Sequence, residues 1–454
     1  MYMVTRSRKL FQRVKINPPQ FFALGFFVLI ALGTFLLMLP FATADRHHLS
    51  FVDALFEATS AVCVTGLVVV DTQTTFTLFG QIVLLCLIQI GGLGFMTLTV
   101  FIAMLLRRTI SYEERHLVKE SLSQDSYEGI IRMVRFVILF TVICELLGTI
   151  ILGMHWGDEF GYPKSFYYGL FHSISAFNNA GFDIMGDFSS MTAYVGDMTV
   201  NLTLTSLLIL GGLGFIVVAD IFQSRKTRKR LMLHTKVVLW MSALLIVGGT
   251  ILIFLLEYGN PDTIGNLPWK DKLLASYFHG VVPRTAGFNS LNTADLTLGS
   301  QLVTMALMFI GGGTGGTAGG IKVTTFAILL FAVWALIKGK QEVNIRNRRI
   351  PGDLVFRAFS ITTYSVLLVS VFVFLLAVTE KGAALNYIAF EVLSAFGTVG
   401  MTLGLTPELS EAGKILLSIL MFMGRVGPIT IAFALAFRIK KTAVRNPEER
   451  VIIG

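Results

Sequence analysis

The sequence predicts an all-α integral membrane protein built from four tandem repeats, and three observations support this fold class. Of the 454 residues, 54% are hydrophobic and only 14% are charged, too few charges to cover a soluble protein of this length. The apolar residues gather in runs long enough to cross about 30 Å of hydrocarbon. Four segments between these runs share one residue pattern.

Eight apolar runs predict eight transmembrane helices, because an open sheet would leave backbone groups unsatisfied in lipid. The run 299–337 is too long for one plain span and contains a glycine-rich interruption. The eight runs are 20–42, 76–106, 130–154, 196–222, 234–257, 299–337, 354–378 and 411–437.

The basic residues predict the orientation of the chain. Its net charge is +9, and 28 of the 37 Lys and Arg residues lie in five connecting segments: 6–15, 107–135, 225–236, 338–357 and 438–450. An even number of spans places both termini on one side, and the charge bias places that side in the cytoplasm. Topology therefore accounts for the positive charge without a nucleic-acid partner. The basic N-terminus lacks the apolar core of a signal peptide and is expected to remain as a cytoplasmic tail.

The three cysteines indicate no redox or metal chemistry. Cys63, Cys86 and Cys144 are odd in number and scattered, which is typical neither of a disulfide framework nor of a metal site. The sequence has no metalloprotease, hydrolase or paired-cysteine motif, so we do not expect an enzyme.

The four similar segments align on a glycine. They read LFEATSAVCVTGL (55–67), LFHSISAFNNAGF (170–182), SYFHGVVPRTAGF (276–288) and AFEVLSAFGTVGM (389–401), with Gly66, Gly181, Gly287 and Gly400 in register. Each has an aromatic residue ten positions before the glycine, and three have Ser six positions before it, with Val281 the exception. The glycines recur every 106 to 115 residues, which indicates an internal repeat.

Each repeat is expected to contain an outer helix, a short re-entrant pore helix that ends near the glycine, and an inner helix. About ten residues of helix reach only half-way across a membrane. The chain is then organised as a cytoplasmic tail 1–17, repeats 18–108, 109–224, 225–340 and 341–438, and a second cytoplasmic tail 439–454. The alternative is eight plain helices joined by apolar loops, which would have no packing reason to remain in water.

The four loops favour a cation-binding function. Non-helical backbone is tolerated at membrane depth where protein buries it or where it lines a water-filled cavity. Around a pseudo-fourfold central pore, loop carbonyls can replace the water of a monovalent cation. The loops contain no acidic residue, which disfavours a Ca²⁺ or Mg²⁺ site. The candidate ion-selectivity filter comprises Val62, Cys63, Val64, Thr65, Gly66, Phe177, Asn178, Asn179, Ala180, Gly181, Pro283, Arg284, Thr285, Ala286, Gly287, Phe396, Gly397, Thr398, Val399 and Gly400.

With these loops the chain resembles the superfamily of K⁺ transporters that includes the bacterial Trk and Ktr proteins and the plant high-affinity K⁺ transporters. The resemblance covers roughly residues 18–440, and its marks are the loop ends TGL, AGF, AGF and VGM, the glycine-rich third inner helix and Arg425. No extra helix pair precedes the first repeat, which makes the chain more similar to the Ktr membrane subunit. Superfamily members with Ser at the first filter glycine favour Na⁺, so Gly66 implies K⁺ held through backbone carbonyls.

The third inner span is expected to break. Seven of the ten residues 311–320 are glycine, and each costs about 1 kcal/mol against alanine in a helix. A loop there would lie below the filter and obstruct the path, and the resemblance also implies an intramembrane gate. The alternative is a small-residue packing surface, which suits GGLGF at 91–95 and 211–215 better. A Walker A loop is excluded, because Lys322 does not follow the last glycine directly. The candidate gating residues are Gly311, Gly312, Gly313, Thr314, Gly315, Gly316, Thr317, Ala318, Gly319, Gly320, Lys322 and Arg425.

Charged residues inside the apolar segments are functional candidates. Arg425 is expected to contact the carbonyls of 311–320, with an ion pair to Glu391 or Glu145 as the alternative. Lys322 is expected to extend toward the cytoplasm. Arg284 is expected to point behind the filter, toward backbone carbonyls or Glu57. Glu57 and Glu391 either attract cations at the mouth or support the filter backbone.

The sequence thus predicts K⁺ uptake across the cytoplasmic membrane. The alternative is an ion-coupled secondary transporter that alternates access around a midplane site, although its repeats are usually inverted. An intramembrane protease has only Gly196-Asp197 as a cue. The resemblance implies a homodimer, a cytosolic nucleotide-binding regulatory ring and no cofactor in this chain. It leaves Na⁺ open as an activator, and membrane lipid is an expected partner.

Overall fold

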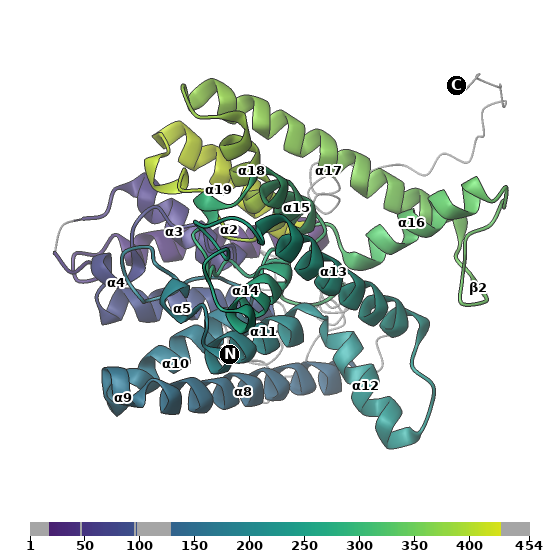
Figure 1. The fold of residues 1–454 in the computed structure, drawn as a ribbon, viewed down its shortest axis with the longest axis horizontal. Helices are drawn as coiled ribbons and strands as arrows, with labels where there is room; N and C mark the ends of the chain where they lie inside the picture. The colour runs from purple at the N-terminus through teal and green to yellow at the C-terminus, as the bar shows by residue number, and fades with distance from the viewer. Residues whose placement is uncertain (1–17, 46–47, 95–96, 98–128, 428–454) are drawn as a thin grey trace, which may run out of the picture.

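The structure is a computed structural model that describes residues 18–45, 48–94, 97 and 129–427. The predicted terminal tails 1–17 and 439–454, and the ends of the expected spans 76–106 and 411–437, lie outside these residues in whole or in part. The described residues are mostly helical, as expected (Figure 1). The one sheet among them is a hairpin of β1 (Asn344–Ile345) and β2 (Arg348–Arg349).

The described helices fall into four groups along the chain. The first group is α2 (Pro18–Leu37), α3 (Phe51–Cys63), α4 (Thr72–Thr75) and α5 (Leu78–Leu93). The second is α8 (Ile130–His155), α9 (Gly157–Phe160), α10 (Tyr162–Phe177), α11 (Met198–Gly212) and α12 (Phe215–Thr227). The third is α13 (Leu233–Glu257), α14 (Trp269–Val281), α15 (Leu298–Phe309) and α16 (Val323–Ile337). The fourth is α17 (Gly352–Thr379), α18 (Leu385–Gly397) and α19 (Glu411–Val426), and short 3₁₀ turns span Thr192–Tyr194, Thr293–Asp295 and Thr406–Glu408.

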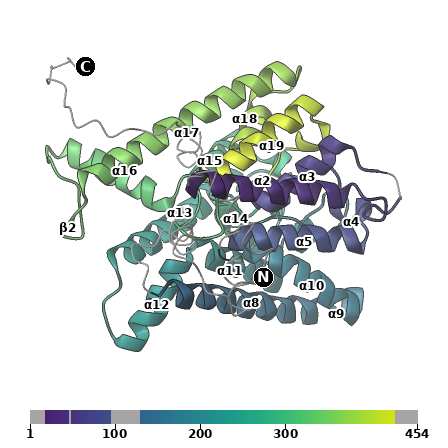
Figure 2. The same ribbon diagram turned by 180° about the vertical axis from the view of Figure 1, so that it is seen from behind.

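The four groups close into a ring. Within each group the outer helix packs against both the short helix and the inner helix, as α8 does against α10 and α11. Between groups, each inner helix contacts the short helix of the next group: α5 contacts α10, α11 contacts α14, and α15 contacts α18. The last inner helix, α19, contacts α3 of the first group, and both views show these two helices side by side (Figures 1 and 2). The repeat boundaries themselves stay a prediction.

The inner helices begin in the same way in all four groups. Each starts at a capping residue whose side chain accepts a hydrogen bond from a backbone N–H in the first turn: Thr77, Asp197, Thr297 and Ser410. The end of the preceding outer helix, or the turn that follows it, also contacts each cap. His155 pairs with Asp197 at 2.5 Å, Glu257 accepts from Thr297, and Glu380 accepts from Ser410. Thr77 donates to the carbonyls of Phe41 and Ala42. These bonds fix where each inner helix enters the fold.

The count of eight transmembrane helices stays a prediction. Among the described residues, three helices are long and apolar enough to cross a membrane without interruption: Ile131–His155, Leu233–Glu257 and Gly352–Thr379. A fourth crossing arises if α11 and α12 form one span, and these two helices are bent by 92°. The predicted run 299–337 is broken as expected, because α15 ends at Phe309 and α16 begins at Val323.

Glycine explains the interruptions. α5, α11 and α19 each end at or just before a glycine with positive φ: Gly94 at 80°, Gly214 at 95° and Gly427 at 92°. This conformation is open to glycine and closed to most other residues, so the helix stops there. The small-residue packing surface expected at 91–95 and 211–215 is only half of the role of these glycines. Gly91 and Gly211 do pack closely, because a Cβ on either would overlap a carbonyl oxygen, that of Val62 or of Phe177.

Candidate functional site: a ring of four glycine loops

Four loops that share two positions of positive φ lie at the ends of α3, α10, α14 and α18. We name them loop 1 (62–66), loop 2 (177–181), loop 3 (283–287) and loop 4 (396–400). The final glycines have φ of 89°, 72°, 75° and 95°. Two positions earlier, φ is also positive, at Val64 (57°), Asn179 (58°), Thr285 (87°) and Thr398 (49°). Three of these residues are β-branched and rarely adopt such angles, so the surrounding structure must hold the strain.

The four glycines meet in a closed ring. A Cβ built on Gly181 would lie 2.7 Å from the carbonyl oxygen of Ala286, and one on Gly287 would lie 2.8 Å from that of Val399. A Cβ on Gly66 would overlap the carbonyl oxygen of Ala180, and one on Gly400 would overlap that of Thr65. Each glycine therefore faces the carbonyl that precedes the glycine of the next loop. The ring gathers four backbone oxygens around one centre and leaves no space for side chains there.

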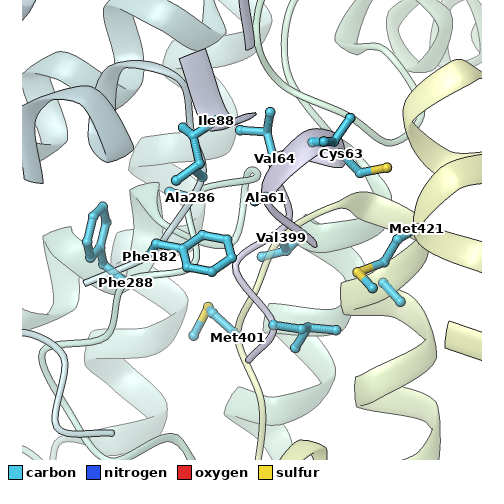
Figure 3. Close-up of a cluster of buried hydrophobic side chains, with 14 of the residues drawn as sticks. Ala61, Cys63, Val64, Ile88, Phe182, Ala286, Phe288, Val399, Met401 and Met421 are labelled. Carbon is cyan, nitrogen blue, oxygen red and sulfur yellow. The ribbon is translucent and has the colours of Figure 1, made fainter. Parts of the chain in front are cut away.

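Apolar side chains surround this ring. Figure 3 shows Val64, Ala286 and Val399 from three of the loops, with the residues that follow the glycines beside them: Phe182, Phe288 and Met401. Phe182, Phe288 and Met401 are all buried. Such a tightly packed surround keeps the loops from relaxing their strained backbone.

All the predicted loop residues are buried except Arg284, which is half-buried. The structure therefore brings the whole predicted set together, with one side chain directed elsewhere. The Arg284 guanidinium donates to the hydroxyl oxygen of Ser242 at 3.1 Å and to its carbonyl oxygen at 3.4 Å, on α13. It points behind the ring, as expected, and bonds to Ser242, whereas Glu57 was one of the two partners considered.

Serine hydroxyls hold two of the loops. Ser60 Oγ accepts from the backbone N–H of Gly66 at 3.0 Å, and Ser394 Oγ accepts from that of Gly400 at 3.0 Å. Ser175 has the same position before loop 2, but among the described residues its hydroxyl has no hydrogen-bond partner. Val281 takes this position before loop 3 and has no hydroxyl. Repeats that align in sequence therefore differ in how they are held.

Polar side chains nine positions before three of the four glycines support the chain just beyond the ring, and Phe278 takes this position before Gly287. Glu57 Oε1 accepts from the N–H of Val69 at 2.8 Å and of Val70 at 3.3 Å. Glu391 accepts from the hydroxyl of Thr406 at 2.9 Å and also from that of Thr402. These bonds favour the support of the backbone over the attraction of cations.

His172 has the corresponding role before loop 2. Its Nδ1 lies 2.7 Å from the Tyr168 carbonyl oxygen and its Nε2 lies 3.5 Å from the N–H of Ile184. A neutral ring with its proton on Nδ1 satisfies both contacts, because Nε2 is then free to accept.

A cavity of about 220 Å³ opens on one face of the ring. All four loop glycines line it, and the carboxyl groups of Asp71 and Asp183 stand at its wall. Their negative charge favours cations at this face.

The glycine-rich segment 311–320 packs against loop 4 and against the backbone of the inner helix α11. Gly313 N donates to the Gly212 carbonyl at 2.7 Å, and a Cβ on Gly319 would overlap the hydroxyl of Thr398 in loop 4. Gly311, Gly312, Gly313, Thr317, Ala318 and Gly319 are buried, and Thr314, Gly315, Gly316, Gly320, Lys322 and Arg425 are half-buried. The segment thus fills the space between the broken inner helices and loops 2 and 4.

Thr317 ties this segment to several parts of the ring. Its hydroxyl bonds to the side chain of Asn179 at 2.6 Å and donates to the Phe177 carbonyl at 3.3 Å. Its N–H donates to the Gly211 carbonyl at 3.2 Å, and its own carbonyl accepts from Arg425. A single threonine therefore connects the segment to loop 2, α11 and α19.

Arg425 bonds to backbone carbonyls. Besides Thr317, its guanidinium donates to the carbonyls of Gly91 and Gly92 on α5. The expected contact with 311–320 is confirmed, and the described residues show no ion pair to Glu391 or Glu145. The expectation for Lys322 is wrong: its ammonium turns back and donates to the Ala318 carbonyl at 2.5 Å.

Sequence reasoning missed several supporting residues. The sequence shows the serines before loops 1 and 4 as a repeated position, but it does not show that their hydroxyls accept from the glycine N–H groups. Ser242, Gln89 and the contact between Glu145 and Asn178 had no signal, because these partners lie far from the loops in sequence.

The family model of cation transport proteins called TrkH matches residues 18–444 of this chain. The chain belongs to the TrkH family. A solved structure of the potassium transporter TrkH from Vibrio parahaemolyticus shares the fold of this TrkH-family chain, with a TM-score of 0.71 and 21% sequence identity. That likeness covers 91% of this chain and 83% of the other. The prediction of the family from the loop motifs is confirmed.

Several relatives match along their whole length. The Ktr system potassium uptake protein B of Bacillus subtilis (strain 168) is 45% identical over 452 residues, which is 100% of both chains. The protein of the same name from Vibrio alginolyticus is 41% identical, over 97% of this chain and 96% of its own. The potassium/sodium uptake protein NtpJ of Enterococcus hirae is 39% identical, over 97% and 98%.

Proposed function

We propose that this TrkH-family chain takes up K⁺ across the cytoplasmic membrane through a selectivity filter formed by loops 1 to 4. The observation that carries the proposal is the ring in which each loop glycine faces the carbonyl of the next loop. Backbone carbonyls can replace the hydration shell of a monovalent cation without any charged side chain. The names of the relatives, which describe potassium uptake, support K⁺ as the ion.

The membrane potential suffices to drive uptake. A potential of about 150 mV supplies roughly 3.5 kcal/mol for each K⁺. At about 1.4 kcal/mol per tenfold, this supports a gradient of several hundredfold. No second ion has to be coupled on energetic grounds, and both termini are proposed to lie in the cytoplasm.

The filter assignment is tested by Gly66→Ser in loop 1. Gly66 has φ of 89° and its Cβ position overlaps the carbonyl oxygen of Ala180, so serine must move two loops apart. We expect the ratio of K⁺ to Na⁺ flux to fall at least about tenfold, which corresponds to about 1.4 kcal/mol. Ion flux into proteoliposomes that contain the full chain measures this ratio.

The control for this test is Gly248→Ser on α13. A Cβ on Gly248 meets nothing within 4 Å, so the control adds the same side chain to a glycine away from the ring. It is expected to keep the parent ratio. An unchanged ratio in Gly66→Ser would refute the filter.

The segment 311–320 is proposed as a gate on the path below the filter. Its support is the set of bonds around Thr317 and Arg425, which hold the segment against loop 2 and three inner helices. An Arg guanidinium beside the path also repels a passing cation. Opening must break these bonds, and a separate cytosolic nucleotide-binding partner, with a homodimer of this chain, is proposed to supply the energy.

Removal of residues 311–316 tests the gate. The shortened segment can no longer fill the space beside loops 2 and 4, so uptake by cells is expected to rise severalfold at equal membrane abundance. Substitution of Arg425 by Gln should act in the same direction with a smaller effect, because it weakens the bonds to Thr317 and Gly91. Normal or reduced uptake in both variants would contradict the gate.

A further inference from the structure

Outside the ring, the side chain of Glu145 is buried on the outer helix α8 and contacts loop 2. We propose that Glu145 is a positioning residue that sets the conformation of loop 2 and thereby the ion discrimination of the ring. This inference rests on the proposed filter and assigns part of its selectivity to a residue that never meets the ion.

Glu145 belongs to a closed triangle of hydrogen bonds. Its Oε1 accepts from Asn178 Nδ2 at 3.1 Å, and its Oε2 accepts from Gln89 Nε2 at 3.4 Å. Asn178 Nδ2 also donates to Gln89 Oε1 at 2.9 Å, which closes the triangle. The three side chains come from α8, loop 2 and α5, so the triangle joins the outer helix of one repeat to the inner helix of the preceding one.

Asn178 has little freedom to take another orientation. It is fully buried, and its Nδ2 also donates to the Ile174 carbonyl at 2.9 Å. Its Oδ1 occupies the space left by Gly92, where a Cβ would overlap it. The residue that follows, Asn179, has φ of 58° and bonds to Thr317. The orientation of Asn178 therefore fixes the start of the strained part of loop 2.

Loop 2 depends on this triangle because it lacks the serine support that holds loops 1 and 4. Those loops have Cys63 and Gly397 at the position of Asn178, and a serine hydroxyl holds their glycine N–H. Ser175, the matching serine of loop 2, has no hydrogen-bond partner among the described residues. The side chain of Asn178 is thus the observed tether of loop 2 to the outer helix.

A carboxyl group is costly at this depth unless hydrogen bonds satisfy it. Glu145 is only 7% exposed, and within the described part of the chain the ion pairs involve other residues. The amide groups of Asn178 and Gln89 are its recorded side-chain partners. The two hydrogens of the Asn178 amide are shared among Glu145, Gln89 and the Ile174 carbonyl. Loss of the carboxyl removes the acceptor that ties Asn178 to α8 and also the recorded acceptor of Gln89 Nε2, which favours a shift of the Asn178 side chain and of the loop.

A simpler role would be to hold α5 and α8 together. Polar contacts between membrane helices commonly do this, and their loss lowers the amount of folded protein. Such a role would not change which ion passes. The ratio of K⁺ to Na⁺ flux therefore separates positioning from adhesion.

The experiment compares Glu145→Leu, Asn178→Asp and the double variant Glu145→Gln with Asn178→Asp. Leucine removes the acceptor, and aspartate places two carboxyl groups in contact. We expect each single variant to lower the flux ratio about tenfold in proteoliposomes, the size of a lost buried hydrogen bond. The double variant exchanges acid and amide and restores the contact between positions 145 and 178, while the bond from residue 178 to the Ile174 carbonyl is lost, so its ratio is expected to rise at least about threefold above that of either single variant.

The matched control is Glu257→Gln, a fully buried carboxyl on another outer helix. Its partners are Thr263, Asn260 and Thr297, away from the ring, so the flux ratio is expected to stay at the parent value. If Glu145→Leu does not reach the membrane, the ratio in Gln89→Leu and in the double variant decides.

The outcomes separate this inference from the filter. Parent-like ratios in the Glu145, Gln89 and Asn178 single variants, together with a lowered ratio in Gly66→Ser, would overturn the positioning role and keep the filter. A lowered ratio in the single variants without recovery in the double variant would overturn the direct contact. A parent-like ratio in Gly66→Ser as well would refute the filter itself.

Discussion

All four loops end in a glycine with positive φ, but different contacts hold loops 1 and 4 and loops 2 and 3. In loops 1 and 4 a serine on the preceding helix accepts from the glycine N–H, so the support is local. In loops 2 and 3 the side chain three positions before the glycine bonds to an outer helix: Asn178 to Glu145 on α8, and Arg284 to Ser242 on α13. The supporting serine in loops 1 and 4 lies six residues before the glycine that it holds. In loops 2 and 3 the supporting residue lies more than thirty residues before its partner.

This difference shows which part of the repeat is fixed by geometry and which part can vary. The glycine is required in all four loops, because each Cβ position is filled by the carbonyl of the next loop. The support around it is free to differ, provided that some contact holds the positive φ two positions earlier. A ring of four matched glycines therefore rests on side chains that differ from loop to loop.

Substitution of the serines that hold loops 1 and 4 is expected to change the flux ratio most. Ser394→Ala removes the acceptor of the Gly400 N–H and leaves a buried donor unpaired, at a cost of about 1–3 kcal/mol. Ser60→Ala does the same to Gly66. We expect each variant to lower the ratio of K⁺ to Na⁺ flux by about fivefold to a hundredfold, measured in proteoliposomes.

Ser175→Ala is the matched control for these variants. Its hydroxyl lies at the same position before loop 2 but has no partner among the described residues, so its loss should leave the flux ratio within about twofold of the parent. Equal effects at all three serines would show that the division into local and distant support is wrong.

The sequence predicted the features that the four repeats share and missed the contacts in which they differ. Four glycines at regular spacing, each preceded by an aromatic residue, predicted the ring, the short helices and the family. The exception at Val281 was visible and marks the loop whose backbone bonding differs, because Ala286 N donates to the Val282 carbonyl at 3.0 Å. In loops 1, 2 and 4 the corresponding N–H reaches one residue further back, as from Thr65 to Ser60 at 2.8 Å.

The missed features depend on residues that are distant in sequence. No local pattern connects Asn178 with Glu145 or Arg284 with Ser242, and a single chain offers no covariation to reveal them. The breaks at Gly94 and Gly214 were missed for another reason. Glycine in an apolar run is compatible both with close packing of two helices and with a helix end at positive φ, and composition alone does not separate the two. The inward turn of Lys322 similarly depends on the position of the Ala318 carbonyl.

A smaller effect is expected from the distant support of loop 3. Ser242→Ala removes the hydroxyl that accepts from Arg284 at 3.1 Å, while the carbonyl of residue 242 remains as a second acceptor at 3.4 Å. One of two acceptors is lost, so we expect a cost of about 0.5–1.5 kcal/mol. The flux ratio should fall about twofold to tenfold. Ser370→Ala on α17 is the control, because its exposed hydroxyl donates to its own helix at Val366. A larger loss than in Ser394→Ala would reverse the order of the two kinds of support.

The smallest effect is expected when loop 3 receives the serine that it lacks. Val281→Ser places a hydroxyl at the position of Ser60 and Ser394, but the backbone of loop 3 already bonds differently, through Ala286 N and the Val282 carbonyl. A serine near a helix end can instead donate to the carbonyl four residues back, so its hydroxyl need not reach Gly287. We expect no gain in ion discrimination, and a loss of about 1 kcal/mol from the exchanged apolar contacts. Thermal unfolding of the purified protein and the flux ratio measure the two quantities. A clear rise in the ratio would mean that loop 3 differs from loops 1 and 4 only by a missing hydroxyl, and that Arg284 and Ser242 do not replace it.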